Sequence, residues 1–362
     1  MAGLAPAAVF PMPGPGSNMV GTLQAVTIAN PDTTLLDVAR HFDLGYPEIT
    51  EANPTVSPWV PRLGSRIIIP TEFILPPGPH EGIVVNIPQR RLFYFVKKTP
   101  GKPAQVITFP VSISQAGWKT PLGETRIIAK FRDPSWVVPK SIREQHMRDG
   151  EMNFPIYFPP GPDNPMGMLA LQTGFSMIFI HGTNRPWGVG MRTSHGCLHL
   201  YPEDAAYLFP MVKLGTPVRI IDKPYTVGVR NGVLYLGSSE LVSEYPSELS
   251  SENRATAALL PYTGQRSSAA SSPPLDIDWA RVFAVAAAHS YLPIPISSGA
   301  PDLEHVAKAI SAEPYTYGPY GSSANNAATP TEELPTEQLP TEQLPTEQLP
   351  TEPLLESGQD QK

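Results

Sequence analysis

The chain has 362 residues, with 45 prolines, one cysteine and a formal net charge of −7 at pH 7. A single cysteine excludes an intramolecular disulfide, and no apolar run reaches the roughly 18 residues that a transmembrane helix requires. Residues 330–362 contain eight acids and one base, so they account for the charge of −7 and residues 1–329 sum to zero. A neutral body argues against nucleic acid as a partner, because nucleic acid generally requires a basic face.

Residues 1–20 form an apolar N-terminal extension, and no Lys or Arg precedes Arg40. The extension therefore lacks the basic region of a signal peptide. If the protein is exported, we expect that its signal peptide is absent from this chain.

Residues 21–72 predict a compact unit with the order strand, helix, helix, strand. Asp32, Thr33 and Thr34 suit a helix N-terminus, and they precede a helical apolar face made by Leu35, Leu36, Val38, Ala39 and Phe42. Gly45 ends this helix, "YPEITEANP" predicts a second one, and "SRIIIP" predicts a strand. The segments "TT-LL-VA--F", "EANP" and "LGSRIIIP" resemble a LysM module. That resemblance implies binding to N-acetylglucosamine-containing glycans, mostly peptidoglycan; a small structural domain without a ligand is the alternative.

Residues 82–222 predict a mainly β domain. Short β-branched or aromatic runs are separated by Pro, Gly and charged residues: "GIVVNI", "RLFYFV", "AQVITFPVSI", "MIFIHG" and "PVRIIDK". Such runs predict a mostly antiparallel sandwich or open barrel. The break at "ILPPGPHEG" predicts that this domain and residues 21–72 fold independently.

The stretch "HGTNRPWGVGMRTSHGCLHL", residues 181–200, contains three of the eight histidines and the only cysteine. A thiol becomes a strong nucleophile when a neighbouring imidazole takes its proton, so this pattern predicts acyl transfer by Cys197. Spacing alone does not identify the base among the histidines. Gly196 lets the backbone approach a substrate and could direct N–H groups at the oxygen of a tetrahedral intermediate. No acid lies in the stretch, so we expect a backbone carbonyl to orient the base.

Two other interpretations of this stretch remain open. His195, Cys197 and His199 alternate, so in a strand they would share one face and could bind a metal with His181 as a fourth ligand. Alternatively, Cys197 is a buried small hydrophobe beside packing histidines. The glycine-rich surroundings favour acyl transfer, because they suit the approach of a substrate.

The order "IHGTN", short loop, "SHGC" resembles the signature of the YkuD-type L,D-transpeptidase catalytic domain. The segments "GIVVNIPQRRLFYF", "KTPLGETRI", "GPDNPMGMLAL" and "GTPVRIID" also follow that family's order. With the LysM-like unit before it, the chain resembles periplasmic enzymes of Gram-negative bacteria. The resemblance therefore implies export to the periplasm, peptidoglycan as substrate, and no cofactor or metal.

The resemblance also implies roles for individual residues. Cys197 would attack the carbonyl of the third residue of a tetrapeptide stem, usually diaminopimelate, and expel the terminal D-Ala. His181 would be the general base and acid, oriented by the Gly182 carbonyl. The frame around the thiol would be Ser194, His195 and Gly196, with the backbone amides of Gly196 and Cys197 holding the oxyanion.

The acceptor of the acyl group stays undecided. The family implies a diaminopimelate amine of a second stem, which gives a 3→3 cross-link, or a lysine of an outer-membrane lipoprotein. Water as acceptor would make the protein an L,D-carboxypeptidase. A non-catalytic peptidoglycan-binding adaptor with a decayed site is a further alternative, although intact His181 and Cys197 favour the enzyme.

One residue departs from the family pattern. His199 stands where the family most often has Arg, and it is a candidate contact for the substrate. Arg stays charged and offers a forked donor, whereas His is mostly neutral near pH 7. Contacts with a substrate carboxylate at this position are therefore in question.

Residues 223–329 are a Ser/Ala/Pro-rich C-terminal extension, and residues 246–329 are interpreted as a linker with two short helices. One helix spans residues 278–290, and the other carries Leu303, Val306, Ala307 and Ile310 after Pro301-Asp302. In residues 330–362 the unit Pro-Thr-Glu-(Glu/Gln)-Leu recurs five times, ending in the altered copy "PTEPL". A proline in every unit predicts a disordered acidic tail.

Overall fold

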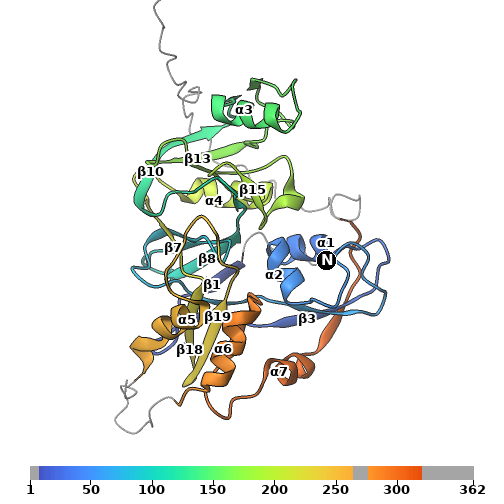
Figure 1. The fold of residues 1–362 in the computed structure, drawn as a ribbon, viewed down its shortest axis with the longest axis vertical. Coiled ribbons are helices and arrows are strands. Elements are labelled where there is room, and N and C mark those ends of the chain that lie inside the picture. The colour runs from blue at the N-terminus through green and yellow to red at the C-terminus, as the bar shows by residue number, and fades with distance from the viewer. Residues whose placement is uncertain (1–7, 264–275, 320–362) are drawn as a thin grey trace, which may run out of the picture.

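The computed structural model describes residues 8–263 and 276–319 (Figure 1). The expected disordered tail, residues 330–362, lies outside the described residues. Within the described part, no helix combines the length and apolar character needed to cross a bilayer. Figure 1 shows a curled central sheet, with helices α1 (Leu35–His41) and α2 (Tyr46–Glu51) on one side and α5 (Ser251–Leu259) and α6 (Trp279–Ala288) below it.

The mainly β fold is confirmed. In the described part the largest sheet has nine strands, in the order β1-β8-β7-β6-β17-β10-β13-β14-β16. Most pairs are antiparallel, while β17–β6 and β14–β16 are parallel. The strands are β1 (Ala8–Pro11), β6 (Gly82–Asn86), β7 (Arg91–Val96), β8 (Gln105–Pro110), β10 (Gly123–Arg132), β13 (Leu169–Thr173), β14 (Phe179–His181), β16 (Leu198–His199) and β17 (Pro217–Ile221).

A short pairing links the last strand back to the region after β8. Strand β9 (Ile113–Ser114) runs parallel to β15 (Arg192–Ser194), and Ser112 forms a bridge with His199. The Ser112 N–H donates to the His199 carbonyl at 2.9 Å, and the His199 N–H donates back at 3.3 Å. The sheet is therefore curled, as expected for an open barrel, and the histidine-rich segment lies at its closure.

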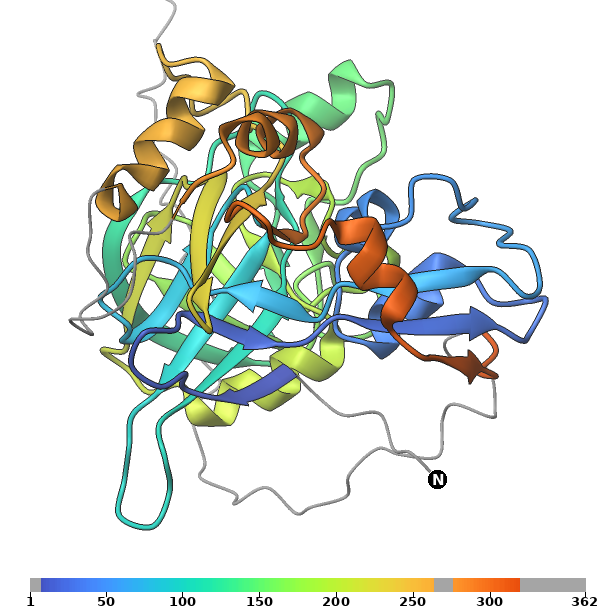
Figure 2. The same cartoon turned by 90° about the horizontal axis from the view of Figure 1, so that it is seen from below.

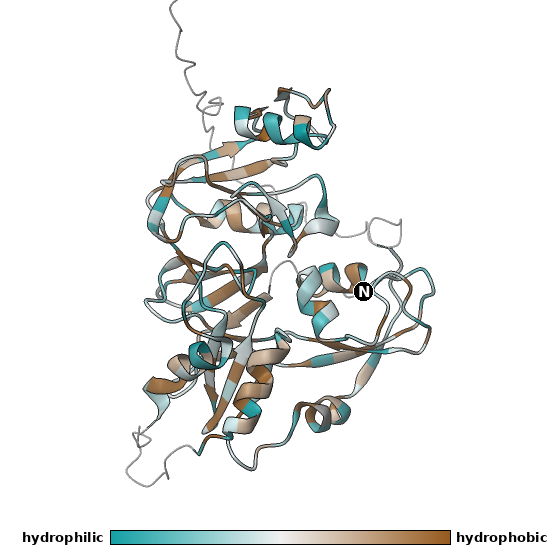
Figure 3. Cartoon of the chain, in the orientation of Figure 1, coloured by the Kyte–Doolittle hydropathy of each residue, from teal (hydrophilic) through white to brown (hydrophobic). Residues whose placement is uncertain are grey.

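The inner face of the curled sheet packs around helix α4 (Pro202–Met211). Buried residues from the sheet and from this helix form one core, which includes Ile83, Ile107, Ile127, Ile180, Leu198, Leu208 and Phe209. Figure 3 shows hydrophobic colours concentrated on the strands of this sheet. An excursion between β10 and β13 carries β11 (Trp136–Val137), α3 (Lys140–Arg148) and β12 (Tyr157–Phe158), at the top of Figure 1.

Residues 21–72 form the expected strand–helix–helix–strand order, with β3 (Gln24–Ile28), α1, α2 and β4 (Arg66–Ile69). Thr34 caps α1, because its hydroxyl accepts the Asp37 N–H at 3.2 Å. Two further short strands, β2 (Met19–Gly21) and β5 (Glu72–Ile74), pair beside this unit. The N-terminal extension is therefore partly structured, since β1 is an edge strand of the central sheet and β2 pairs with β5.

Independent folding of the two units stays a prediction, but in the whole chain they are packed together. Residues of the N-terminal unit share one buried cluster with the outer face of the central sheet, which contributes Val84, Phe93, Phe95 and Val106. These side chains are between 0% and 4% exposed. The reason is geometric: strands β6 to β8 are apolar on both faces, so a second layer has to cover the outer face.

The interpretation of residues 246–329 as a linker is wrong for the residues that the structure describes. Strands β18 (Tyr225–Arg230), β19 (Val233–Ser238) and β20 (Pro293–Pro295) form a sheet that packs on α5 and α6 with a core of its own. The two expected helices exist as α6, capped by Asp278, and α7 (Leu303–Ala309), capped by Asp302.

The chain then returns to the N-terminal unit. Strand β21 (Ala312–Tyr315) runs parallel to β3. Figure 2 shows both strands next to α7. Arg66 donates to the Ala307 carbonyl at 2.7 Å, and the Thr33 hydroxyl donates to the Tyr317 carbonyl at 2.6 Å. The segment after α6 therefore completes the sheet of the N-terminal unit.

Candidate active site

Strand register brings Cys197 and His181 to one face of the sheet. In the parallel pair β14–β16, Ile180 lies opposite Leu198 and His181 lies opposite His199. Ile180 and Leu198 point into the main core. Since side chains alternate along a strand, His181, His199 and Cys197 point to the other face. Cys197 directly precedes β16, and His181 ends the neighbouring strand β14.

His181 is 3% exposed, and its ring orientation is fixed. Nδ1 lies 2.6 Å from the Gly182 carbonyl oxygen, as expected for the orienting group. A carbonyl only accepts, so Nδ1 carries the proton and Nε2 of the neutral ring is an acceptor. Burial lowers the pKa of His181 to about 4, although hydrogen bonding to the Gly182 and Met166 backbone acts in the opposite direction. The ring is therefore neutral near pH 7.

Cys197 is a partly buried free thiol. Its Sγ lies 3.5 Å from the Met177 carbonyl oxygen, and it joins a small cluster with Phe131, Met166 and Phe179. Burial raises the pKa of Cys197 to about 11, while a hydrogen bond from the Phe179 backbone lowers it. Both groups are thus uncharged near neutral pH, and this is the state from which a thiol passes its proton to an imidazole during attack.

The backbone around the thiol is held on both sides. The Ser194 hydroxyl donates to the Cys197 carbonyl at 2.6 Å and accepts the Gly196 N–H at 3.2 Å. The Thr120 hydroxyl donates to the Gly196 carbonyl at 2.9 Å. Gly196 has a φ of +122°, and a Cβ there would lie 3.0 Å from Ile178 Cδ1, so only glycine suits this turn. The Gly196 N–H, an expected oxyanion donor, is engaged within the turn.

His195 lies in a separate polar cluster. Its ring meets the Trp118 ring edge-on at 4.6 Å, and its Nε2 lies 3.1 Å from Gln115 Nε2 and 3.2 Å from Gln145 Oε1. Burial, followed by the charge of His146, lowers the pKa of His195 to about 4. Gln145 comes from α3, and no sequence motif pointed to it.

His199 packs against the proposed base. The ring centroids of His199 and His181 are 4.6 Å apart. Burial lowers the pKa of His199 well below its usual value, and the charges of His181 and His195 lower it further. Among the described residues, no group of three or more His, Cys, Asp or Glu side chains is arranged to hold a metal ion.

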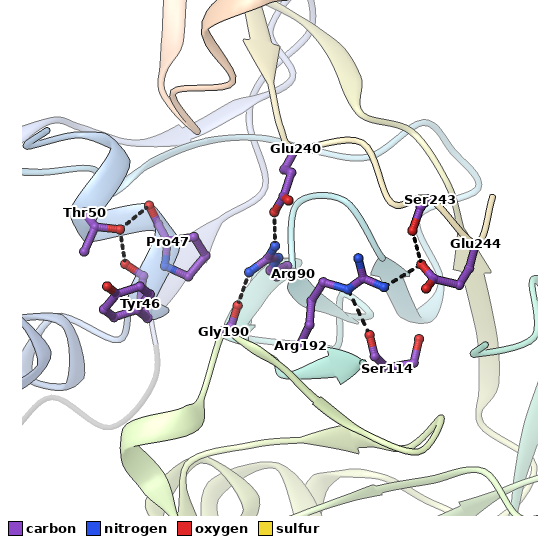
Figure 4. Close-up of polar contacts among 10 residues, drawn as sticks. All are labelled: Tyr46, Pro47, Thr50, Arg90, Ser114, Gly190, Arg192, Glu240, Ser243 and Glu244. Atoms are coloured by element: carbon purple, nitrogen blue, oxygen red, sulfur yellow. Dashed lines mark hydrogen bonds and ion pairs between the residues drawn. The ribbon is translucent and has the colours of Figure 1, made fainter. Parts of the chain in front are cut away.

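The loop from His181 to Ser194 is held by parts of the chain that lie far away in sequence. Figure 4 shows Arg90 donating to the Gly190 carbonyl at 2.9 Å while pairing with Glu240. The same view shows Arg192, which donates to the Ser114 carbonyl at 3.2 Å and pairs with Glu244 at 2.5 Å. Sequence reasoning missed these arginines, because their partners carry no motif.

The N-terminal unit contacts the same loop. The Tyr46 N–H donates to the Val189 carbonyl at 3.2 Å. Gly45 and Gly190 are in such close contact that a Cβ on Gly190 would lie 2.6 Å from the Gly45 Cα. In α2 the Thr50 hydroxyl donates to the Tyr46 carbonyl at 3.0 Å, which Figure 4 also shows. The first turn of α2 therefore contacts the loop that joins His181 to the segment carrying Cys197.

Comparison with known proteins decides the family. Residues 80–220 match the family model YkuD, the L,D-transpeptidase catalytic domain. The probable L,D-transpeptidase ErfK/SrfK of Salmonella typhimurium is 36% identical over 299 residues, which cover 81% of this chain and 93% of that protein. The chain belongs to the L,D-transpeptidase family. The probable L,D-transpeptidase YbiS of Escherichia coli K12 is 40% identical over 222 residues, which cover 61% of this chain and 71% of that protein.

Among solved structures, L,D-transpeptidase 3 from Mycobacterium tuberculosis is 18% identical to this L,D-transpeptidase, with a TM-score of 0.28. The alignment covers 45% of this chain and 73% of that one. The family assignment rests on sequence identity, and it makes this chain an enzyme of the L,D-transpeptidase class. Both members of the expected Cys–His pair lie within the matched residues.

Proposed function

We propose that this L,D-transpeptidase acts on peptidoglycan in the periplasm and uses Cys197 as its nucleophile. The observation that carries the proposal is the placement of Cys197 and His181 on one sheet face, with His181 Nδ1 held by the Gly182 carbonyl. With Nδ1 engaged in this way, Nε2 is the ring nitrogen left to accept a proton from Cys197, the only thiol of the chain.

In the first half-reaction, the Cys197 thiol passes its proton to His181 Nε2 as sulfur attacks the carbonyl of the third stem residue. The tetrahedral intermediate collapses with cleavage of the bond to the terminal D-Ala, whose nitrogen takes the proton from His181. The product is a thioester on Cys197. The backbone N–H groups of Cys197 and Gly196 stabilise the oxyanion, the latter by exchanging its 3.2 Å contact with Ser194 for the substrate oxygen.

In the second half-reaction, an acceptor amine loses a proton to His181 as its nitrogen attacks the thioester carbonyl. The carbon–sulfur bond breaks, and the proton returns to the thiolate. Either a diaminopimelate amine or a lysine of a lipoprotein satisfies this chemistry, and water would give hydrolysis. Residues 21–72, the LysM-like unit, would bind the glycan of the same polymer. His195 would shape the site through its Gln145 and Trp118 contacts.

The test is incubation of the protein with purified tetrapeptide muropeptides, with and without a lysine-terminated peptide, followed by mass spectrometry. Release of D-Ala together with a cross-linked dimer or a peptide adduct supports transpeptidation. Release of D-Ala with tripeptide as the sole product identifies a carboxypeptidase. Binding without any release would support the adaptor alternative, and loss of activity to a chelator with recovery on zinc addition would support the metal alternative.

A further inference from the structure

Residues 243–245 lie after β19 and outside the matched residues 80–220, yet they hold residues 117–120, the segment whose Thr120 side chain binds the turn that carries the thiol. We propose that Tyr245, acting through Thr120, is a positioning residue that fixes the Cys197 N–H as an oxyanion donor. The proposal rests on the proposed function, in which Cys197 is the nucleophile. It assigns a role in acyl transfer to a segment beyond the catalytic domain of the family.

Two buried hydrogen bonds connect Tyr245, through Thr120, to the residue before Cys197. Tyr245 is 5% exposed, and its hydroxyl donates to the Thr120 carbonyl at 2.6 Å. Thr120 is fully buried, and its own hydroxyl donates to the Gly196 carbonyl at 2.9 Å. Thr120 is therefore held at its backbone by Tyr245 and holds the neighbour of Cys197 with its side chain.

The geometry of the peptide group couples the Gly196 carbonyl to the Cys197 N–H. The Gly196 carbonyl and the Cys197 N–H belong to the same planar peptide group and point in opposite directions. A hydrogen bond that fixes the carbonyl therefore also fixes the direction of the N–H. Hydrogen bonding at the carbonyl also polarises the N–H of the same peptide, which strengthens it as a donor.

A second anchor explains why residues 243–245 stay in place. The Glu244 carboxylate accepts the Gly117 N–H at 2.9 Å, pairs with Arg192 at 2.5 Å, and accepts the Ser243 hydroxyl at 3.0 Å. The side chains of Arg192 and Glu244 are 20% and 12% exposed, so solvent screens this pair less than a surface pair. Gly117 and Thr120 lie on one segment, which residues 243–245 hold at two points.

The variants are made in the full chain. Tyr245→Phe keeps the ring in the core and removes the hydroxyl. Tyr225→Phe is the matched control, because Tyr225 is 4% exposed and its hydroxyl donates to the Ala286 carbonyl at 3.2 Å, in the sheet of β18 to β20. Thr120→Val removes the second hydrogen bond, and Thr120→Ser keeps it.

We expect kcat for D-Ala release to fall about tenfold or more in Tyr245→Phe, with KM within about twofold, since outright loss of an oxyanion donor costs 10²–10³. Thr120→Val should behave likewise, and Thr120→Ser should retain activity. The double variant Tyr245→Phe/Thr120→Val should lose little more than either single one, because both act along one chain. Alkylation of the only cysteine by iodoacetamide should keep its wild-type rate, since it needs no oxyanion donor.

Turnover by Tyr245→Phe equal to that of Tyr225→Phe would overturn the proposal. So would a parallel fall of turnover and alkylation, because that result indicates general disturbance of the site. If Thr120→Val does not fold, Tyr245→Phe and Thr120→Ser still decide the matter. An inactive wild-type protein, or turnover by Cys197→Ala, would instead overturn the proposed function.

Discussion

The Arg91 guanidinium donates two hydrogen bonds to the Glu48 carboxylate, at 2.8 and 2.7 Å, across the junction between the N-terminal unit and the central sheet. Their side chains are 1% and 6% exposed. Glu48 also accepts the Gly45 N–H at 2.7 Å, and Arg91 donates to the Asp43 carbonyl at 2.9 Å. The N-terminal unit is thus docked on the central sheet through a buried ion pair.

Arg91→Met should therefore destabilise the whole molecule. It leaves the Glu48 carboxylate buried without its cation, which typically costs about 3–5 kcal/mol in free energy of unfolding. Urea unfolding measures the loss. Lys97→Met is the control, because Lys97 pairs with Glu81 at the surface, where their side chains are 74% and 47% exposed. This variant should change the free energy of unfolding by less than about 1 kcal/mol. Equal losses for the two variants would contradict the docking role.

Activity should depend on pH through His181. Because its pKa lies near 4, the neutral base predominates above that value, and kcat/KM should fall only as the pH drops through about 4. Alkylation of Cys197 should rise with pH toward about 11, where the thiolate forms. His181→Gln should lower kcat by about 10²–10⁴, while the control His305→Gln, on the exposed face of α7, should not. A half-maximal rate near pH 6.5 would show that His181 titrates as an ordinary histidine.

His199→Arg tests the departure from the family pattern. An added guanidinium should bind a substrate carboxylate, so we expect a KM about three- to tenfold lower near neutral pH. We expect kcat to change little, because His181 is already neutral there and a neighbouring positive charge only lowers its pKa further. Steady-state kinetics across the neutral range measures both constants. Identical KM values for the two proteins would assign His199 to packing against the His181 ring.

Gly190→Ala should separate the N-terminal unit from the loop between His181 and Ser194. Gly190 has a φ of +86°, and a Cβ would lie 2.6 Å from the Gly45 Cα, so the substitution adds both strain and a clash. We expect a loss of more than about 2 kcal/mol in free energy of unfolding and a lower kcat. Gly188→Ala is the control in the same loop, because the nearest atom to its Cβ would be Thr193 Cγ2 at 3.7 Å. Similar values for both variants would contradict the importance of this contact.

Local patterns predicted what local interactions decide. The Thr34 cap starts α1, Asp278 starts α6, and an apolar run delivers His181 to the end of β14. The Cys197 motif leads into β16, which pairs with β14, in agreement with the expectation that adjacent segments supply the Cys and the His. Each of these features depends on residues within a few positions of one another, so periodicity and capping rules suffice.

Features that depend on distant pairs left no local signal. Glu48 and Arg91 are ordinary charged residues in sequence, and only the fold makes them partners. Pairing of β21 with β3 joins residues almost 290 positions apart, and "AEPY" contains a proline, which argues locally against a strand. Likewise, Tyr245 and Thr120 meet only because the segment after β19 returns to the closure of the sheet.

The pairing of β21 with β3 has a consequence for the order of folding. Strand β3 is made early in synthesis, but its partner follows only after the central sheet and the sheet of β18 to β20. The sheet of the N-terminal unit therefore closes a loop that contains most of the polypeptide, and contacts of such large sequence separation slow folding. The sheet of the N-terminal unit is therefore completed last. Until β21 has been synthesised, the edge of β3 is unpaired and can pair with other strands.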